Sequence, residues 1–126
     1  MLKSLNPALA LAALVGMTLP AVAAPVTLSP QQIGATFATG APFKSASPAG
    51  TIFTLVLKAG GIASRTPKGS ALGTDGTWRL NATGYCSKWG NNSENCFTVQ
   101  NNGGKYSVMD AKGGLAAIWT PPTPPK

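Results

Sequence analysis

From residue 51 onward, short stretches of apolar and β-branched residues are separated by glycines and other turn residues. The stretches cover residues 51–58, 62–66, 77–83, 85–89, 96–100, 105–110 and 115–120. Residues 77–83 show the two-residue alternation of a half-buried strand, with Trp78 and Leu80 on one face and Arg79 on the other. Strands about ten residues apart, joined by turns such as NNGG at 101–104, are typical of an antiparallel meander. We therefore predict a mainly β protein whose meander forms a small barrel or sandwich.

A short N-terminal helix is expected before the strands. Ser29 can cap it, and Gln32 follows three residues later, as a capping box requires. A proline at the first helical position and a glycine after the last turn suit the same helix. The pattern predicts a helix over residues 30–38, with Ile33 and Phe37 on its buried face.

The two ends of the chain differ in composition from the middle. Residues 1–23 combine a basic start, an apolar run over 8–19 and a small-x-small site ending at Ala23, which is the layout of a secretory signal peptide. That run is shorter than the roughly 20 residues needed to span a bilayer, so the mature chain is expected to lack a transmembrane segment. Four prolines in residues 120–126 predict a disordered Pro-rich tail. Residues 24–119 are expected to form a single β-rich domain.

Cys86 and Cys96 are the only cysteines. An even count in an exported chain predicts one structural disulfide, here closing a hairpin between residues 85–89 and 96–100. Redox pairs usually have a C-x-x-C spacing, which this chain lacks. Two thiols with no histidine and one nearby carboxylate, Glu94, do not complete a zinc shell, so neither a metal nor a cofactor is expected.

The charge balance limits the chemistry that the chain can perform. The sequence has 10 Lys+Arg, 3 Asp+Glu and no histidine. The missing histidine removes the usual general base and the Ser-His-Asp and Cys-His arrangements, and three carboxylates leave little for acid–base pairs. We therefore expect no catalytic residues and no enzymatic activity. After loss of Lys3 with the signal peptide, the net charge is still +6.

Trp89 stands out among the aromatic residues because it lies beside Lys88 between the two cysteines. Two interpretations stay open for it: core packing against the disulfide, or a ligand contact at a loop tip. Trp78 and Trp119, by contrast, are predicted to be core residues. The candidate binding residues are Trp89, Lys88, Tyr85 and Arg79.

A basic protein with exposed aromatic side chains attracts anions. The candidate partners are an anionic polysaccharide, a lipid surface or an acidic protein. Nucleic acid is not expected, because the chain carries no signature of an RNA- or DNA-binding module and is predicted to be exported.

Several short motifs lie at defined spacings. They are GTWR at 76–79, GYCSKW at 84–89, CFTV at 96–99 and a tyrosine at 106. Together they resemble a family of small exported proteobacterial proteins of unknown function with a G-T-W-R…Y-C…W…C-F-x-V pattern. The G-x-W part is distantly similar to lipocalin-like barrels, although it lies in the middle of this chain. The resemblance implies an exported β-rich protein and assigns no activity.

The sequence thus predicts a periplasmic or secreted, non-enzymatic binding or interaction module, with an anionic envelope component as its partner. Two alternatives stay open: an inhibitor of an exported hydrolase, and a structural envelope-associated protein without a discrete ligand. A deep apolar cavity would favour a protein that binds a small ligand. A protruding disulfide loop would favour an inhibitor, and a filled core with a flat basic face would favour the structural envelope role.

The N-terminal pattern makes a prediction about processing. In its native cell the exported protein should have an intact mass that corresponds to a chain starting at Ala24, because the small-residue site ends at Ala23. Mass spectrometry of the periplasmic and culture fractions measures this. Recovery of only the full-length chain from the cytoplasm would contradict the prediction.

Overall fold

The computed structural model describes residues 24–122. The predicted signal peptide and the last four residues of the predicted tail lie outside this range. The elements are β1 (Val26–Thr27), α2 (Pro30–Phe37), β2 (Thr39–Ala46), β3 (Ile52–Lys58), β4 (Ile62–Pro67), β5 (Thr74–Leu80), β6 (Tyr85–Trp89), β7 (Asn95–Asn102), β8 (Lys105–Met109) and β9 (Leu115–Thr120). Over the described range, no helix has both the length and the apolar character needed to cross a membrane.

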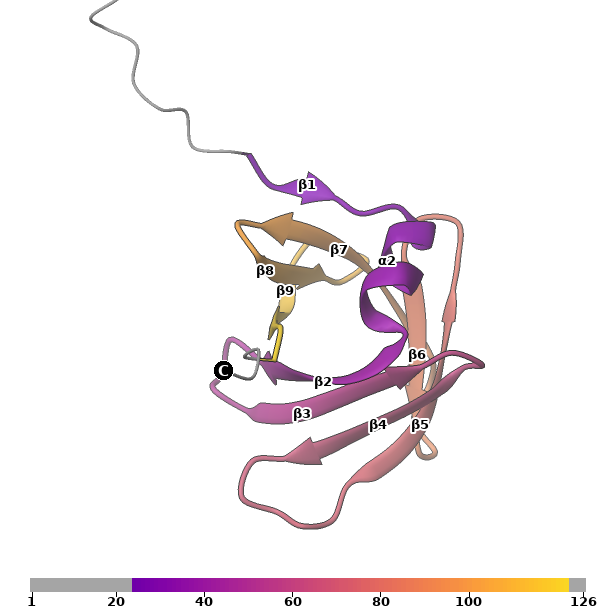
Figure 1. The fold of residues 1–126 in the computed structure, drawn as a ribbon, viewed down its shortest axis with the longest axis vertical. Coiled ribbons are helices and arrows are strands. Elements are labelled where there is room, and N and C mark those ends of the chain that lie inside the picture. The colour runs from indigo at the N-terminus through magenta and orange to yellow at the C-terminus, as the bar shows by residue number, and fades with distance from the viewer. Residues whose placement is uncertain (1–23, 123–126) are drawn as a thin grey trace, which may run out of the picture.

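The strands form one closed sheet (Figure 1). Each strand from β2 to β8 pairs antiparallel with the next, and β9 pairs antiparallel with β2, so the sheet closes into an eight-stranded barrel. The short strand β1 adds to β7 through the pairs Val26–Asn101 and Thr27–Gln100. The prediction of a mainly β antiparallel meander with a short N-terminal helix is confirmed, and the meander is a barrel rather than a sandwich.

Strand β2 closes the barrel, and the sequence pattern does not predict it. Its residues, TGAPFKSA, include a glycine and a proline, and Phe43 is its one buried large side chain. Pro42 is tolerated because the register with β3 shifts between Thr39 and Pro42, where a missing N–H costs least. The strand forms because β3 and β9 offer it hydrogen-bonding edges on both sides.

Several predicted boundaries differ from the structure; β7, for example, covers Asn95–Asn102 rather than 96–100, and two other differences have a clear local cause. Residues 77–83 were expected to form one strand, but β5 runs from Thr74 to Leu80. It ends there because the Asn81 side chain accepts hydrogen bonds from the backbone N–H groups of Thr83 (3.1 Å) and Gly84 (2.6 Å), which makes a turn. The tail was expected to begin at residue 120, but Thr120 is the last residue of β9 and pairs with Lys44. The prolines that follow end the strand.

Helix α2 caps one end of the barrel (Figure 1). The predicted capping box is confirmed: the Gln32 N–H donates to Ser29 Oγ (3.2 Å), and the Ser29 N–H donates to Gln32 Oε1 (2.8 Å). Ile33 and Phe37 are fully buried. The Phe37 ring makes edge contacts with three other rings at centroid distances of 4.8–4.9 Å, namely those of Phe43, Tyr106 and Trp119. The helix therefore closes this end with aromatic packing.

Side chains alternate between the barrel interior and the outer surface, as expected for antiparallel strands. The buried cluster takes residues from α2 and from every strand of the barrel; its members include Leu55, Leu57, Ala63, Trp78, Tyr85, Val99, Val108 and Trp119. The predicted core positions of Trp78 and Trp119 are confirmed, at 8% and 3% exposure. The Trp78 indole N–H also donates to the Lys58 carbonyl oxygen at 2.8 Å.

The helix cap generates a prediction about stability. Phe37→Ala should lower the free energy of unfolding by about 3–5 kcal/mol, because it leaves a cavity at the meeting point of three aromatic rings. Gln31→Ala, at an exposed position of the same helix, is the matched control and should change it by less than about 0.5 kcal/mol. Urea unfolding followed by tryptophan fluorescence measures both. Equal effects of the two substitutions would show that the helix is not a structural cap.

Candidate functional site

The barrel interior is not completely filled. A cavity of about 240 Å³ lies inside the barrel, toward the end opposite α2. The lining places it there: Ser45 and Ser47 lie where β2 ends, Phe53 near the start of β3, Arg65 late in β4 and Trp89 at the end of β6. At about 30 Å³ per water molecule in the liquid, the volume corresponds to about eight water molecules.

Aromatic rings form the floor of the cavity. Tyr85 stacks on Phe97 with ring centroids 5.3 Å apart and contacts Trp119 at 5.4 Å. Trp119 in turn contacts Phe37 of the helix at 4.9 Å. The floor therefore separates the cavity from the end of the barrel that α2 caps, and a ligand would have to enter from the other end.

Arg65 is the one charged residue of the cavity lining. It faces inward because it lies two residues after Ala63, which is fully buried, on the same face of β4. Its guanidinium carbon lies 5.0 Å from the centre of the Phe53 ring and 4.5 Å from that of Trp89, in two cation–π contacts.

No residue between 24 and 122 forms a hydrogen bond or an ion pair with the Arg65 side chain. Partial burial lowers the pKa of Arg65 from its ordinary value, yet arginine stays protonated in proteins. The cavity therefore contains a positive charge whose N–H donors have no acceptor among residues 24–122.

A glycine allows Trp89 to reach Arg65. Gly76 of β5 lies directly opposite Trp89 of β6 in the sheet. A Cβ atom at Gly76 would lie 2.6 Å from the Trp89 ring and would also collide with the Lys88 carbonyl oxygen. The absence of a side chain at Gly76 therefore gives the indole the space to lie over β5.

Hydroxyl groups supply the other polar atoms of the cavity. Tyr85 and Ser87, two residues apart on the inner face of β6, line it at 4% and 7% exposure. Neither hydroxyl has a hydrogen-bond partner within residues 24–122, but neither is sealed from solvent. Burial raises the pKa of Tyr85 well above its ordinary value, so this phenol stays neutral and can donate a hydrogen bond.

The four candidate binding residues divide between the two faces of the sheet. Tyr85 and Trp89 line the cavity, whereas Lys88 and Arg79 are exposed on the outside of the barrel. Trp89 thus packs against the core, as one interpretation expected, but from the end of β6 and on the face away from the disulfide rather than against it or at a loop tip. The alternation along β6 directs it inward with Tyr85, while Cys86 lies on the opposite face with Lys88.

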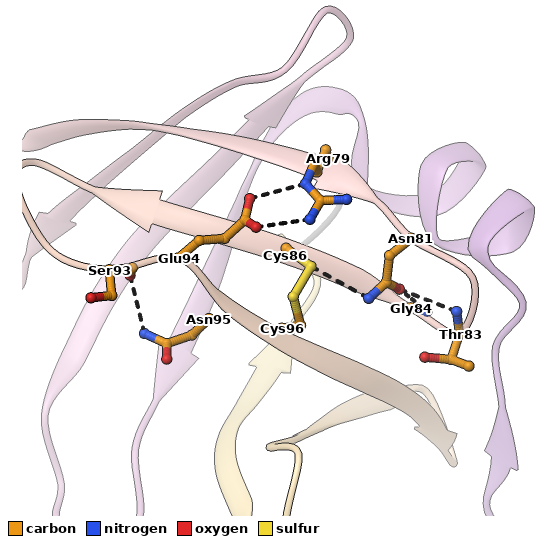
Figure 2. The surroundings of a disulfide bond; sticks show 9 residues. All are labelled: Arg79, Asn81, Thr83, Gly84, Cys86, Ser93, Glu94, Asn95 and Cys96. Atoms are coloured by element: carbon orange, nitrogen blue, oxygen red, sulfur yellow. Dashed lines mark hydrogen bonds and ion pairs between the residues drawn. A yellow bond between two sulfur atoms is a disulfide. The ribbon is translucent and has the colours of Figure 1, made fainter.

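Arg79 binds Glu94 on the outer surface (Figure 2). Its Nε and Nη2 atoms donate to the two carboxylate oxygens at 3.0 and 2.8 Å. This hydrogen bonding lowers the pKa of Glu94 and raises that of Arg79. Because the pair is solvent-exposed, it contributes little to stability. Arg79 already has a carboxylate partner, so its charge is less available to a ligand.

The Cys86–Cys96 disulfide lies beside this ion pair and confirms the predicted bridge. The two cysteines are direct cross-strand partners in β6 and β7. Cys86 is fully buried, and the Asn81 side-chain amide donates to its sulfur at 3.4 Å. In the described part of the chain, possible metal-ligand atoms gather at one place, where those of Cys86, Cys96 and Glu94 lie within 4.8 Å of one another. Because the two sulfurs are bonded to each other, this place offers one carboxylate rather than a set of thiolates.

Sequence reasoning missed the residues that surround the charge in the cavity, Arg65 and Phe53. Neither residue is among the candidate binding residues predicted from the sequence. The predicted hairpin of residues 51–66 contains a signal for the inward position of Arg65. Pairing across its glycine turn places Arg65 opposite Leu55, which is an apolar strand residue. Residues opposite each other in an antiparallel pair share a face, so Arg65 follows Leu55 to the inside.

Comparisons of the chain with protein-family models, with curated proteins and with solved structures gave no match. The resemblance to small exported proteobacterial proteins therefore stays a prediction.

The disulfide generates a prediction. The Cys86→Ser/Cys96→Ser variant should lose about 2–3 kcal/mol of unfolding free energy, because the bridge restricts the unfolded chain. Arg79→Gln, which removes only the exposed ion pair beside the bridge, is the control and should cost less than about 1 kcal/mol. Chemical denaturation of the oxidised proteins measures both. A double-serine variant as stable as the wild type would contradict a structural role for the bridge.

Proposed function

We propose that this protein is an exported, non-enzymatic binding module that holds a small ligand inside its barrel. The observation that carries the proposal is the cavity with apolar walls and, among its lining residues, an arginine that has no ion-pair partner in the described part of the chain. Pockets that bind small molecules combine mostly apolar walls with a few well-placed polar groups, and this cavity has that composition.

The energetics of the cavity support the proposal. An unfilled apolar space destabilises a protein by about 24 cal/mol per Å³, because its walls lose their packing contacts. The inward positions Ser45, Ser87 and Ala117 carry small side chains, which keep the space open. Larger residues there would fill the space and remove this cost. A ligand that occupies the cavity restores packing contacts to its walls and so offsets this loss of stability when it binds.

The chemistry of the lining supports binding rather than catalysis. Arg65 and Tyr85 are the titratable residues among those that line the cavity. Arg65 stays charged and Tyr85 stays neutral near pH 7, so the pair does not exchange a proton with a substrate.

The alternatives drawn from the sequence have less support. An inhibitor would present the loop between β6 and β7, but this loop is short, and Glu94 at its end is bound to Arg79 of β5. A purely structural envelope role would suit a filled core with a flat basic face. The open cavity favours a discrete ligand, and the charge of Arg65 favours an anionic one, in line with the predicted anionic envelope component.

The proposal makes a prediction about filling the cavity. Ala117 lies opposite the buried Val108 and lines the cavity, so Ala117→Phe should occupy it. In NMR titrations with octanoate and with octan-1-ol, the indole N–H signal of Trp89 should shift in the wild type. The Ala117→Phe protein should bind both compounds at least tenfold more weakly.

Ala82→Phe, at an exposed turn position, is the control and should bind both compounds as the wild type does. Thermal melting of both variants confirms that each is folded. Unchanged binding by folded Ala117→Phe, or no binding of either compound by the wild type, would reject the cavity as a binding site.

A further inference from the structure

We infer that the ligand is an unbranched carboxylate with a medium-length alkyl chain, bound with its apolar end toward the Tyr85–Phe97–Trp119 floor and its carboxylate on Arg65. This inference rests on the proposed binding function and specifies the chemical class of the ligand. Three observations support it: the size of the cavity, the position of the charge within it and the geometry of the free donors.

The cavity limits the length of the ligand. Its volume of about 240 Å³ corresponds to about eight carbon groups of an alkyl chain, if each occupies about as much space as a water molecule in the liquid. The two oxygens of a carboxylate at the end of such a chain would then lie at the open end of the cavity, beside Arg65. Along β6, Trp89, Ser87 and Tyr85 face inward in succession, and Trp89 and Tyr85 are four residues apart. At about 3.3 Å per residue, the wall that these residues form runs for about 13 Å along the strand. A narrow, deep space of this kind suits one extended alkyl chain.

The charge lies at one end of this space, away from the floor. Arg65 pairs with Thr74, the first residue of β5, and so belongs to the open end of the barrel. The floor rings lie toward the helix cap, since Trp119 contacts Phe37. A ligand with a charged group at one end and an apolar chain at the other matches this polarity. No Asp or Glu side chain is among the residues that line the cavity, so nothing in the lining repels an anion.

The two cation–π contacts favour a carboxylate. The guanidinium carbon lies over the rings of Phe53 and Trp89, 5.0 and 4.5 Å from their centres, and these contacts do not use its N–H groups as donors to an oxygen. The N–H groups of arginine point outward in its plane, where a carboxylate accepts two parallel hydrogen bonds. An alcohol accepts fewer and weaker hydrogen bonds there, and an ammonium group is repelled.

The test compares three compounds that share an eight-carbon chain and differ in their polar group: octanoate, octan-1-ol and octylammonium. Wild-type protein should bind octanoate at least tenfold more tightly than octan-1-ol, and octylammonium more weakly still. Arg65→Gln should lose the preference for octanoate, with its affinity for octan-1-ol changed by less than about threefold. Arg79→Gln, which removes an arginine from the outer face, should keep the wild-type preference.

Two further measurements sharpen the test. Arg65→Lys keeps the charge but loses the planar pair of donors, so its preference for octanoate should fall between those of the wild type and Arg65→Gln. Hexadecanoate, whose chain exceeds the cavity, should bind the wild type more weakly than octanoate. Calorimetry on each folded variant gives the affinities.

The outcomes separate this inference from the proposed function. Equal affinity of the wild type for octanoate and octan-1-ol, or an unchanged preference in Arg65→Gln, would overturn the carboxylate assignment while leaving the cavity as a binding site. Tighter binding of hexadecanoate than of octanoate would overturn the length assignment in the same way. If the wild-type protein bound none of the compounds, octan-1-ol included, the proposed function itself would be rejected.

Discussion

The pairing of β2 with both β3 and β9 is the constraint on which the rest of the structure depends. Residues 44–46 pair with 118–120 on one side and 52–54 on the other, and these two ladders close the sheet. Closure removes the free edges that an open sheet would expose, and it forces one face of every strand into a common interior. The helix cap, the aromatic floor and the cavity all exist because that interior is closed.

The interior is divided by its aromatic residues rather than filled evenly. Phe37 of the helix and Trp119 of β9 pack together, and Tyr85 and Phe97 extend the layer. On one side of this layer the helix completes the packing. On the other side small inward residues and the Arg65 side chain leave space open to the outside. One half of the barrel is thus closely packed, whereas the other half contains the cavity.

Two arginines show how position decides what a residue can do. Arg79 is exposed, and Glu94 already satisfies it with two hydrogen bonds. Arg65 is partly buried between two rings and has no acceptor among the described residues. A cation in water interacts weakly with an added anion, whereas one in a less polar setting interacts more strongly. Arg65 is therefore the stronger candidate for binding an anion, although the candidate binding residues predicted from the sequence include Arg79 and not Arg65.

Local interactions could be predicted from the sequence because neighbouring residues complete them. The capping box of Ser29 and Gln32, the disulfide hairpin and most of the strands depend on residues close together in the chain. Tertiary structure decided what depends on distant partners. Strand β2 has a poor strand pattern and forms because β9, some seventy residues away, pairs with it. The cavity and the role of Arg65 depend on strand register and on barrel closure, since these determine which side chains meet inside. Neither strand register nor barrel closure can be read from the composition of the chain or from the spacing of its motifs.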